Sequence, residues 1–242
     1  MSAPDRAISP TLLAHLDELP LVRRSIFDTV RDFAAHLPHE ARVLDAGAGE
    51  APYAELFEHC AYVTVDWPHS VHGAARSADI VASLENLPVP NHSFDAVLCT
   101  EVLEHVGQPE AVLAELNRVL ARQGRLCLTV PFVWPLHEEP FDFYRYTPHA
   151  LRALLEAAGF ADVDVAPRTG YFTTLAQIAE MTGWLQRRPA PLRRALKLRI
   201  CLHLARACVV PLTWLAKRDP GLDQDLTGVP LPLGYRVLAS KV

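Results

Sequence analysis

The segment Ala41-Arg-Val-Leu-Asp-Ala-Gly-Ala-Gly-Glu-Ala-Pro-Tyr53 carries the most informative pattern in this chain. Its second to fourth residues are typical of a buried strand, and Asp45 stands at the carboxyl end of that strand. Gly47 and Gly49 predict a tight loop, and we expect a helix to begin at Tyr53. A strand, a glycine loop and a helix N-terminus together form a nucleotide-binding cradle in an open α/β sheet.

The rest of the chain alternates between strand and helix patterns. Further strands are expected at 61–66, 79–83, 93–100, 125–130, 160–165 and 234–241, and helices at 21–37, 109–121 and 147–158. This alternation predicts an α/β fold: a Rossmann-like, seven-stranded, mostly parallel sheet with helices on both faces. We expect a single domain over 1–242, with an N-terminal arm and helix at 1–40 and a loose arm over its first 20 residues. A helical insertion is expected at about 172–218, before the last strand.

The composition is that of a globular protein from a reducing compartment. Of the 242 residues 50% are hydrophobic and 21% are charged, so a large core can be buried. The five cysteines are an odd number without a Cys-x-x-Cys pair, which indicates neither a disulfide framework nor a zinc site. Residues 1–20 lack the apolar core of a secretory signal, so a cytoplasmic location is expected.

A basic segment at 181–218 contrasts with the net charge of −5 of the whole chain, because it holds nine Lys and Arg and no Asp or Glu. It is interpreted as a helical cap over the substrate crevice. The alternative is an interfacial region that contacts anionic lipid at the inner membrane face. Its longest uncharged piece, 207–216, is too short to cross a bilayer. Nucleic acid is not expected as a partner, because few aromatic residues lie among the basic ones.

The glycine loop alone is compatible with any nucleotide. In a dinucleotide-binding Gly-x-Gly-x-x-Gly/Ala turn the last position is small, whereas this chain has Pro52 there. Asp45 is placed to accept hydrogen bonds from the loop or from an ammonium group. Asp66, at the end of the second predicted strand, is placed to accept both hydroxyls of a ribose. No basic residue lies in the loop, so these features favour a cofactor held without phosphate contacts.

Five motifs in order carry a resemblance to a known family. They are Leu44-Asp-Ala-Gly-Ala-Gly49, Val65-Asp66, Asn86-Leu-Pro-Val-Pro90, Ser93-Phe-Asp-Ala-Val-Leu-Cys-Thr-Glu-Val-Leu-Glu-His105 and Leu116-Asn-Arg-Val-Leu-Ala-Arg-Gln-Gly-Arg-Leu126. Together they resemble class I S-adenosylmethionine-dependent methyltransferases, and most closely the small-molecule group similar to the enzymes of ubiquinone and menaquinone biosynthesis. The resemblance covers about 40–165 and returns at 234–241.

The resemblance implies S-adenosylmethionine as the cofactor and assigns roles around it. Gly47 and Gly49 would approach the methionine part, and Asp45 would lie near its amino group. The other cofactor residues implied are Asp66 at the ribose, Trp67, Ser83 and Leu84 beside the adenine, and Thr100 and Glu101 beneath the sulfonium. Ser83 departs from the pattern, which often has Asp there, so its contact with the adenine amino group is in question. The alternative for Asp45 and Asp66 is a capping or loop role.

The loop after the fifth predicted strand, 131–147, is the richest polar cluster, and such loops line the ligand crevice of an open α/β sheet. His137 is predicted to act as general base or substrate orienter, because imidazole titrates near neutrality. His105 is the second catalytic candidate. Its alternative, shared with Glu101 and Glu104, is a solvated helix start, and for Glu104 that interpretation is favoured.

Trp134, Tyr144 and Arg145 are predicted to bind the substrate, the last two through an anionic group. An ion pair of Arg145 with Glu138, Glu139 or Asp142 is the alternative. Phe141 and Phe143 are expected to lie in the core. No metal is predicted: a site of His137, Glu138 and Glu139 is weighed and set aside, because residues adjacent in sequence rarely point at one ion.

The sequence thus predicts S-adenosylmethionine-dependent methyl transfer to an oxygen or carbon of a small or lipid-like molecule, with nitrogen less favoured. The alternative is a non-catalytic protein of the same fold that serves as a membrane- or partner-binding module. A third interpretation, an NAD-dependent enzyme, is opposed by Pro52.

Overall fold

The computed structural model describes residues 8–18, 20–68, 78–185, 207, 210, 211, 214 and 231–242. Its contacts divide the chain into two compact units. The sheet unit comprises residues 1–166 and 234–242, and the insertion unit comprises residues 167–233. The two units are described separately below.

The sheet unit is built on seven strands. They are β1 (Arg42–Ala46), β2 (Ala61–Asp66), β3 (Ile80–Val81), β4 (Phe94–Thr100), β5 (Leu120–Pro131), β6 (Phe160–Pro167) and β7 (Gly234–Lys241). Their order across the sheet is β3-β2-β1-β4-β5-β7-β6. The pairs from β3 to β5 are parallel, whereas β7 runs antiparallel to β5. The predicted mostly parallel, seven-stranded sheet is confirmed.

The central strand β4 shows why the sheet forms. Its residues 96–99 are all fully buried. A strand in the middle of a parallel sheet is covered on both faces, so a continuous apolar run is expected instead of alternation. The core cluster on this strand also takes in Leu113 and Leu116 of one helix and Leu151 and Leu155 of another.

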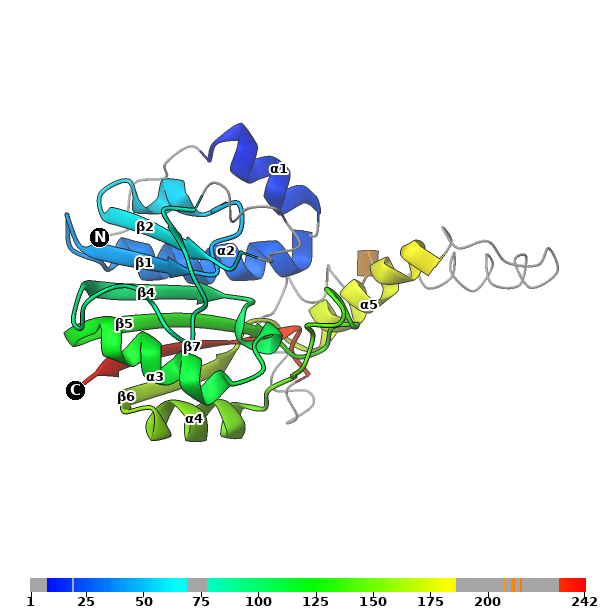
Figure 1. The fold of residues 1–242 in the computed structure, drawn as a ribbon. Coiled ribbons are helices and arrows are strands. Elements are labelled where there is room, and N and C mark those ends of the chain that lie inside the picture. The colour runs from blue at the N-terminus through cyan, green and yellow to red at the C-terminus, as the bar shows by residue number, and fades with distance from the viewer. Residues whose placement is uncertain are drawn as a thin grey trace. The chain divides into compact units, whose positions relative to one another are not determined.

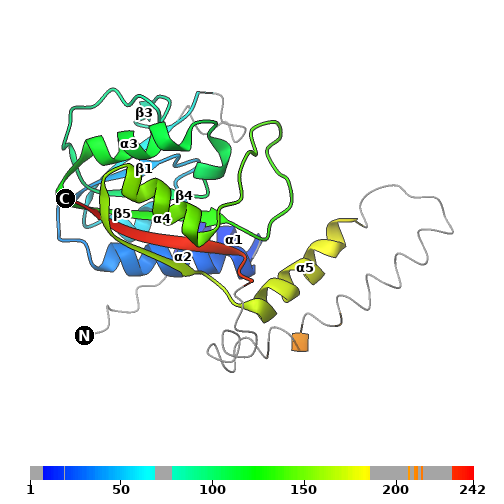
Figure 2. The same cartoon turned by 90° about the horizontal axis from the view of Figure 1, so that it is seen from below.

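Helices cover both faces of this sheet. They are α1 (Pro10–Glu18), α2 (Pro20–Ala35), α3 (Pro109–Val119) and α4 (Pro148–Ala157), with two short 3-10 turns, η1 (Ala54–Phe57) and η3 (Leu103–His105). In Figures 1 and 2, α2 lies on one face, and α3 and α4 lie on the other. Thr147 starts α4 as predicted, because its hydroxyl accepts the hydrogen bond of the Ala150 amide at 3.2 Å.

The expectation of a loose arm over residues 1–20 is wrong where the structure describes it, because Pro10–Glu18 forms α1. Leu12 and Leu16, four residues apart, are 2% and 0% exposed, so one face of this helix is part of the core. The hydroxyl of Ser9 caps the helix by accepting from the Leu12 amide at 3.1 Å.

Two predicted helix boundaries also differ. The helix expected at Tyr53 is only the four-residue turn η1, because β2 begins four residues after that turn ends. The helix expected to run to Ala121 ends at Val119, because Leu120 already has extended backbone and pairs with Phe94 of β4.

In the insertion unit, the described helix is α5 (Tyr171–Leu185), the first part of the predicted helical insertion. The Thr174 hydroxyl donates to the Gly170 carbonyl at 3.0 Å, and the Leu233 amide donates to the Thr169 hydroxyl at 2.8 Å. Most of the basic segment at 181–218 lies outside the described residues. Among the described helices, none is both long and apolar enough to span a membrane.

Candidate functional site

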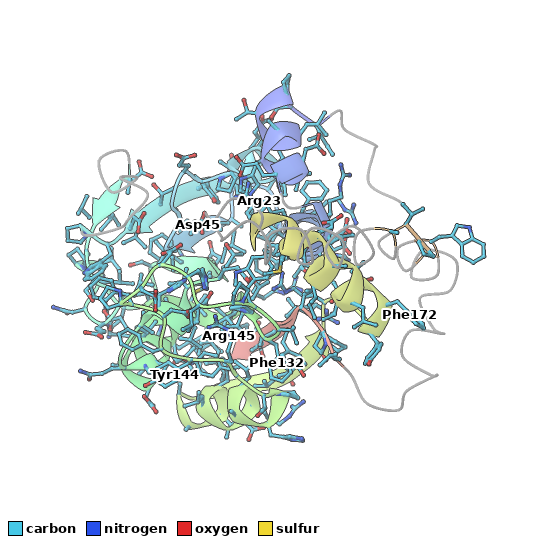
Figure 3. All side chains as sticks on the ribbon, turned by 90° about the vertical axis from the view of Figure 1, so that its right-hand side faces the viewer. Arg23, Asp45, Phe132, Tyr144, Arg145 and Phe172 are labelled. Carbon is cyan, nitrogen blue, oxygen red and sulfur yellow. The ribbon has the colours of Figure 1, made fainter. Side chains whose placement is uncertain are left out.

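The candidate site lies at the carboxyl edge of the parallel strands, where the sheet order switches between β1 and β4. Asp45, the last residue but one of β1, and the long loop after β5 both belong to this edge. Figure 3 looks onto it, with Asp45, Tyr144 and Arg145 labelled. All of these residues belong to the sheet unit.

The glycine loop requires glycine at its first position for two reasons. Gly47 has a φ of 77°, and a Cβ added there would lie 2.5 Å from Cγ2 of Val102. The amides of Gly47 and Ala48 both donate to the Val65 carbonyl, at 2.9 and 3.0 Å, which fastens the loop to β2. Gly49 also has a positive φ, of 55°, but a Cβ there would meet nothing within 4 Å. The second glycine therefore faces open space that a ligand can approach.

Asp45 is 2% exposed, so its carboxyl group is removed from water. One oxygen, Oδ2, accepts a hydrogen bond from the hydroxyl of Tyr62, whereas Oδ1 has no hydrogen-bond partner among the described residues. Burial raises the pKa of Asp45 to about 7, the Tyr62 hydrogen bond lowers it in part, and the charge of Asp66 adds to the rise. A buried carboxyl oxygen without a donor is costly, and it is satisfied when a ligand supplies that donor.

Asp66 repeats this arrangement at the end of β2. Its side chain is 6% exposed, and Oδ1 accepts from the Trp67 amide at 2.7 Å. The other oxygen, Oδ2, is buried and receives no hydrogen bond within the described part of the chain. The Trp67 ring lies edge-on to Phe141 with their centroids 5.2 Å apart, so the loop after β5 reaches the end of β2.

The other predicted cofactor residues occupy the neighbouring strand ends. Leu84 is 7% exposed and belongs to the core cluster, and the Ser83 hydroxyl accepts from the Glu85 amide at 3.3 Å. Thr100 is the last residue of β4. Glu101 follows it with a φ of 53°, and its amide donates to the Thr129 carbonyl at 3.0 Å. This turn leads the chain from β4 into η3.

The structure brings the two predicted catalytic histidines together. The rings of His105 and His137 lie edge to face, with centroids 4.7 Å apart. Nε2 of His105 is 3.6 Å from Oε1 of Glu104. The expectation that Glu104 is solvated is wrong: it is 0% exposed, because η3 turns its side chain inward beneath the loop after β5. That loop is tied to it by the Phe143 amide, which donates to the Glu104 carbonyl at 2.9 Å.

The predicted substrate residue Arg145 is engaged within the loop. Its guanidinium forms two bonds to the Asp142 carboxylate, from Nη1 at 2.6 Å and from Nη2 at 2.9 Å, so the ion pair considered as the alternative is present. It also donates to the Pro135 carbonyl at 3.0 Å and to that of Trp134 at 3.4 Å. The Arg145 hydrogen bonds hold the pKa of Asp142 well below its usual range.

The aromatic residues of this loop are partly on the surface. The core position expected for Phe141 and Phe143 is wrong, since they are 37% and 50% exposed. Tyr144 is 38% exposed, and its hydroxyl donates to the Gly107 carbonyl at 3.3 Å. Tyr146 is the residue that fills the core, where its hydroxyl donates to the Leu103 carbonyl at 2.9 Å. The loop therefore presents an apolar rim beside the histidines.

Three side chains of the candidate site were not predicted from the sequence. Tyr62 supports Asp45 from the neighbouring strand, Asp142 supports His137, and Glu104 faces His105. The strand register that places Tyr62 diagonally to Asp45 is not visible in the sequence. The sequence shows the adjacent Glu104 and His105 after the fourth predicted strand, but it does not show that Glu104 is buried.

Comparison with known sequences settles the family. Residues 20–165, more than half of the chain, match the methyltransferase domain family. The chain belongs to this family. Membership confirms the predicted resemblance to methyltransferases.

Two curated O-methyltransferases are similar in sequence to this chain. Malonyl-[acyl-carrier protein] O-methyltransferase of Alcanivorax borkumensis is 31% identical over 161 residues, which are 56% of this chain and 54% of that protein. Ubiquinone biosynthesis O-methyltransferase of Xanthomonas oryzae pv. oryzae is 30% identical over 158 residues, 60% of this chain and 61% of that protein. The chain thus spans little more than half the length of the curated relatives it matches.

Among solved structures, a SAM dependent methyltransferase from Archaeoglobus fulgidus aligns with a TM-score of 0.57 and 15% identity. The alignment covers 95% of this chain and 99% of that one. At this identity the likeness shows the fold alone.

Proposed function

We propose that this protein binds S-adenosylmethionine between the glycine loop and Asp66 and transfers its methyl group to an oxygen of a small or lipid-like acceptor. Carbon is the next acceptor, and nitrogen is less favoured. The observation that carries the proposal is the pair of buried carboxyl oxygens, Asp45 Oδ1 and Asp66 Oδ2, that receive no hydrogen bond among the described residues.

These two oxygens suit the cofactor chemically. An ammonium group at Asp45 would supply both a hydrogen bond and the positive charge that a buried carboxylate lacks. Ribose hydroxyls at Asp66 would satisfy Oδ2 in the same way. The open space at Gly49 lets the ligand approach the backbone between them. No phosphate has to be neutralised, which agrees with the absence of a basic residue from the loop at 46–53.

When bound, the cofactor supplies an electrophilic methyl group on a sulfonium. The residues of the chain have to hold the acceptor in line, remove its proton and keep water out. His137 is suited to the proton: its Nδ1 lies 3.1 Å from the Asp142 carboxylate, which orients the ring and leaves Nε2 free to accept. In the balanced step the acceptor hydroxyl loses a proton, its oxygen bonds to the methyl carbon, and the carbon–sulfur bond breaks.

The names of the relatives support oxygen as the acceptor atom, since the two proteins described above are O-methyltransferases. The exposed aromatic rim formed by Phe141, Phe143 and Tyr144 supports an acceptor with an apolar part. The remaining predicted substrate residue, Trp134, lies in the same loop and accepts from Arg145 through its carbonyl.

Titration calorimetry with S-adenosylhomocysteine tests the proposal. We expect binding by the native protein and a strong loss in Asp66→Ala, whereas Asp28→Asn, on the surface of α2, binds as the native protein does. Absence of binding by the native protein would support the non-catalytic alternative. Transfer of a labelled methyl group to hydroxyl, carboxyl and amine acceptors that share one apolar group then identifies the acceptor atom.

The organisation of the whole chain is a further part of this proposal: one methyltransferase domain with 1–40 as its N-terminal element and about 172–218 as an insertion. The nine basic residues at 181–218 support contact with anionic lipid. Sedimentation with anionic vesicles tests it, and replacing Arg187, Arg188, Arg193 and Arg194 by Ser is expected to abolish it. A cytoplasmic location remains a prediction.

A further inference from the structure

We propose that Glu104, His105 and His137 form a binding site for a divalent transition-metal cation. One oxygen of Glu104 and one ring nitrogen of each histidine lie within 4.8 Å of one another. The three residues come from two segments, η3 and the loop after β5, so the fold assembles them at one point. Binding of the cation does not depend on the function proposed above.

The hydrogen bonds of the two rings leave the nitrogens that a cation needs. Nδ1 of His105 lies 2.9 Å from the Phe141 carbonyl, which can only accept, so this nitrogen carries the proton. Nδ1 of His137 lies 3.1 Å from the Asp142 carboxylate, which likewise accepts. In both rings Nε2 is therefore the nitrogen with a free lone pair. Metal-ligating histidines have the same support, with the second nitrogen held by a carbonyl or carboxylate.

The support of His137 is itself held firmly. The side chain of Asp142 is 1% exposed, and Arg145 binds both of its oxygens. Asp142 is therefore fixed in place and keeps the ring of His137 in one orientation. A histidine that acts only as a base needs one such contact, but here both rings have one, and one nitrogen of each ring lies within 4.8 Å of a Glu104 oxygen.

The carboxylate of this site is buried. Glu104 is 0% exposed, and the charge of Arg145 already acts on it. Nε2 of His105 is 3.6 Å from Glu104 and 4.0 Å from Glu138, so two carboxylates face one imidazole. A dication placed among these groups would be attracted by both carboxylates. This site differs from the set weighed from the sequence: Glu104 and His105 are adjacent, yet the 3-10 turn lets both face one point.

The donor set selects the class of cation. Two imidazole nitrogens and one carboxylate oxygen favour Zn²⁺, Co²⁺ or Mn²⁺ over Mg²⁺ and Ca²⁺, which prefer oxygen ligands. Three protein ligands leave a coordination position open. One consequence rests on the proposed function. An acceptor hydroxyl bound to the metal would be more acidic, so its proton would pass to water and not to His137.

Co²⁺ binding tests the site, because its visible absorption reports nitrogen and oxygen ligands directly. Untagged protein is stripped with a chelator and titrated with Co²⁺, and then with Zn²⁺ and Mg²⁺ as competitors. We expect one equivalent of Co²⁺ to bind with ligand-field bands, Zn²⁺ to displace it, and Mg²⁺ to leave it in place. His137→Gln and Glu104→Gln are expected to abolish the bands. His149→Gln, an exposed histidine on α4, is the matched control and retains them.

The outcomes separate the inference from the proposed function. Circular dichroism shows whether each variant is folded. If Glu104→Gln does not fold, His137→Gln still tests the site, because the side chain of His137 is 27% exposed. No Co²⁺ binding by the native protein, or bands that persist in folded His137→Gln, would overturn the metal site. The same stripped protein is titrated with S-adenosylhomocysteine. If the protein binds S-adenosylhomocysteine but does not bind Co²⁺, the metal site alone is overturned. If it binds Co²⁺ but does not bind S-adenosylhomocysteine, the proposed function alone is overturned.

Discussion

Replacing Asp45 by Asn is expected to stabilise the cofactor-free protein and to weaken cofactor binding at the same time. The carboxyl group is buried, and its pKa is about 7 in the folded protein against 3.8 for an ordinary Asp. That difference corresponds to about 4 kcal/mol by which ionised Asp45 destabilises the native state. Asn has nearly the same shape, can still accept from Tyr62, and never ionises.

The sign of the pH dependence follows from the two pKa values. Between about pH 4 and pH 7 the unfolded chain has released the proton of Asp45 while the folded protein still holds it, so native stability falls as the pH rises. The advantage of Asp45→Asn should therefore be about 4 kcal/mol at pH 8 and about 2 kcal/mol at pH 5. At pH 8 this amounts to an increase in Tm of about 10 °C.

Cofactor affinity should change in the opposite direction. Loss of one charged hydrogen bond to an ammonium group costs about 2 kcal/mol, which is roughly 30-fold in Kd. The assays are thermal melts at both pH values and calorimetry with S-adenosylmethionine, with Asp28→Asn as the exposed control. The reasoning is refuted if Asp45→Asn melts no higher than the native protein at pH 8, or if its advantage is equal at both pH values.

Three further predictions concern the same edge of the sheet. Gly47→Ala should lower the free energy of unfolding by about 2 kcal/mol in urea and abolish cofactor binding, because its Cβ would lie 2.5 Å from Val102. Gly49→Ala should lower the free energy of unfolding by only about 1 kcal/mol, and an equal decrease for the two variants would contradict this expectation. In calorimetry, the native affinity for S-adenosylmethionine should fall about tenfold per pH unit below pH 7, as Asp45 takes up a proton, and level off near the roughly 30-fold loss expected for Asp45→Asn; a flat profile would count against its role. Asp142→Asn should lower the free energy of unfolding by about 2 kcal/mol, because the Asp142 side chain of the ion pair with Arg145 is buried. Thermal melts measure this, and an unchanged Tm would contradict it.

The order of the elements and the position of the glycine loop could be predicted from local sequence patterns. Apolar runs ended by Asp45 and Asp66 predict strands and their carboxyl ends, because strand periodicity and strand-ending residues are local properties. The expected strands at 61–66 and 234–241 agree with the observed bounds. Boundaries failed where a neighbouring element competes: Leu120 leaves its helix because it pairs with Phe94 across the sheet.

Which side chains meet could not be predicted, because it depends on how distant segments pack. The hydroxyl of Tyr62 reaches Asp45 through the register between β1 and β2, and Glu104 is buried because the loop after β5 folds over η3. His105 and His137 are 32 residues apart in the chain yet have ring centroids 4.7 Å apart. Such contacts depend on the packing of distant segments, and local sequence patterns carry no record of them. The identity of the residues was therefore available from the sequence, while the chemistry that they perform together depends on the fold.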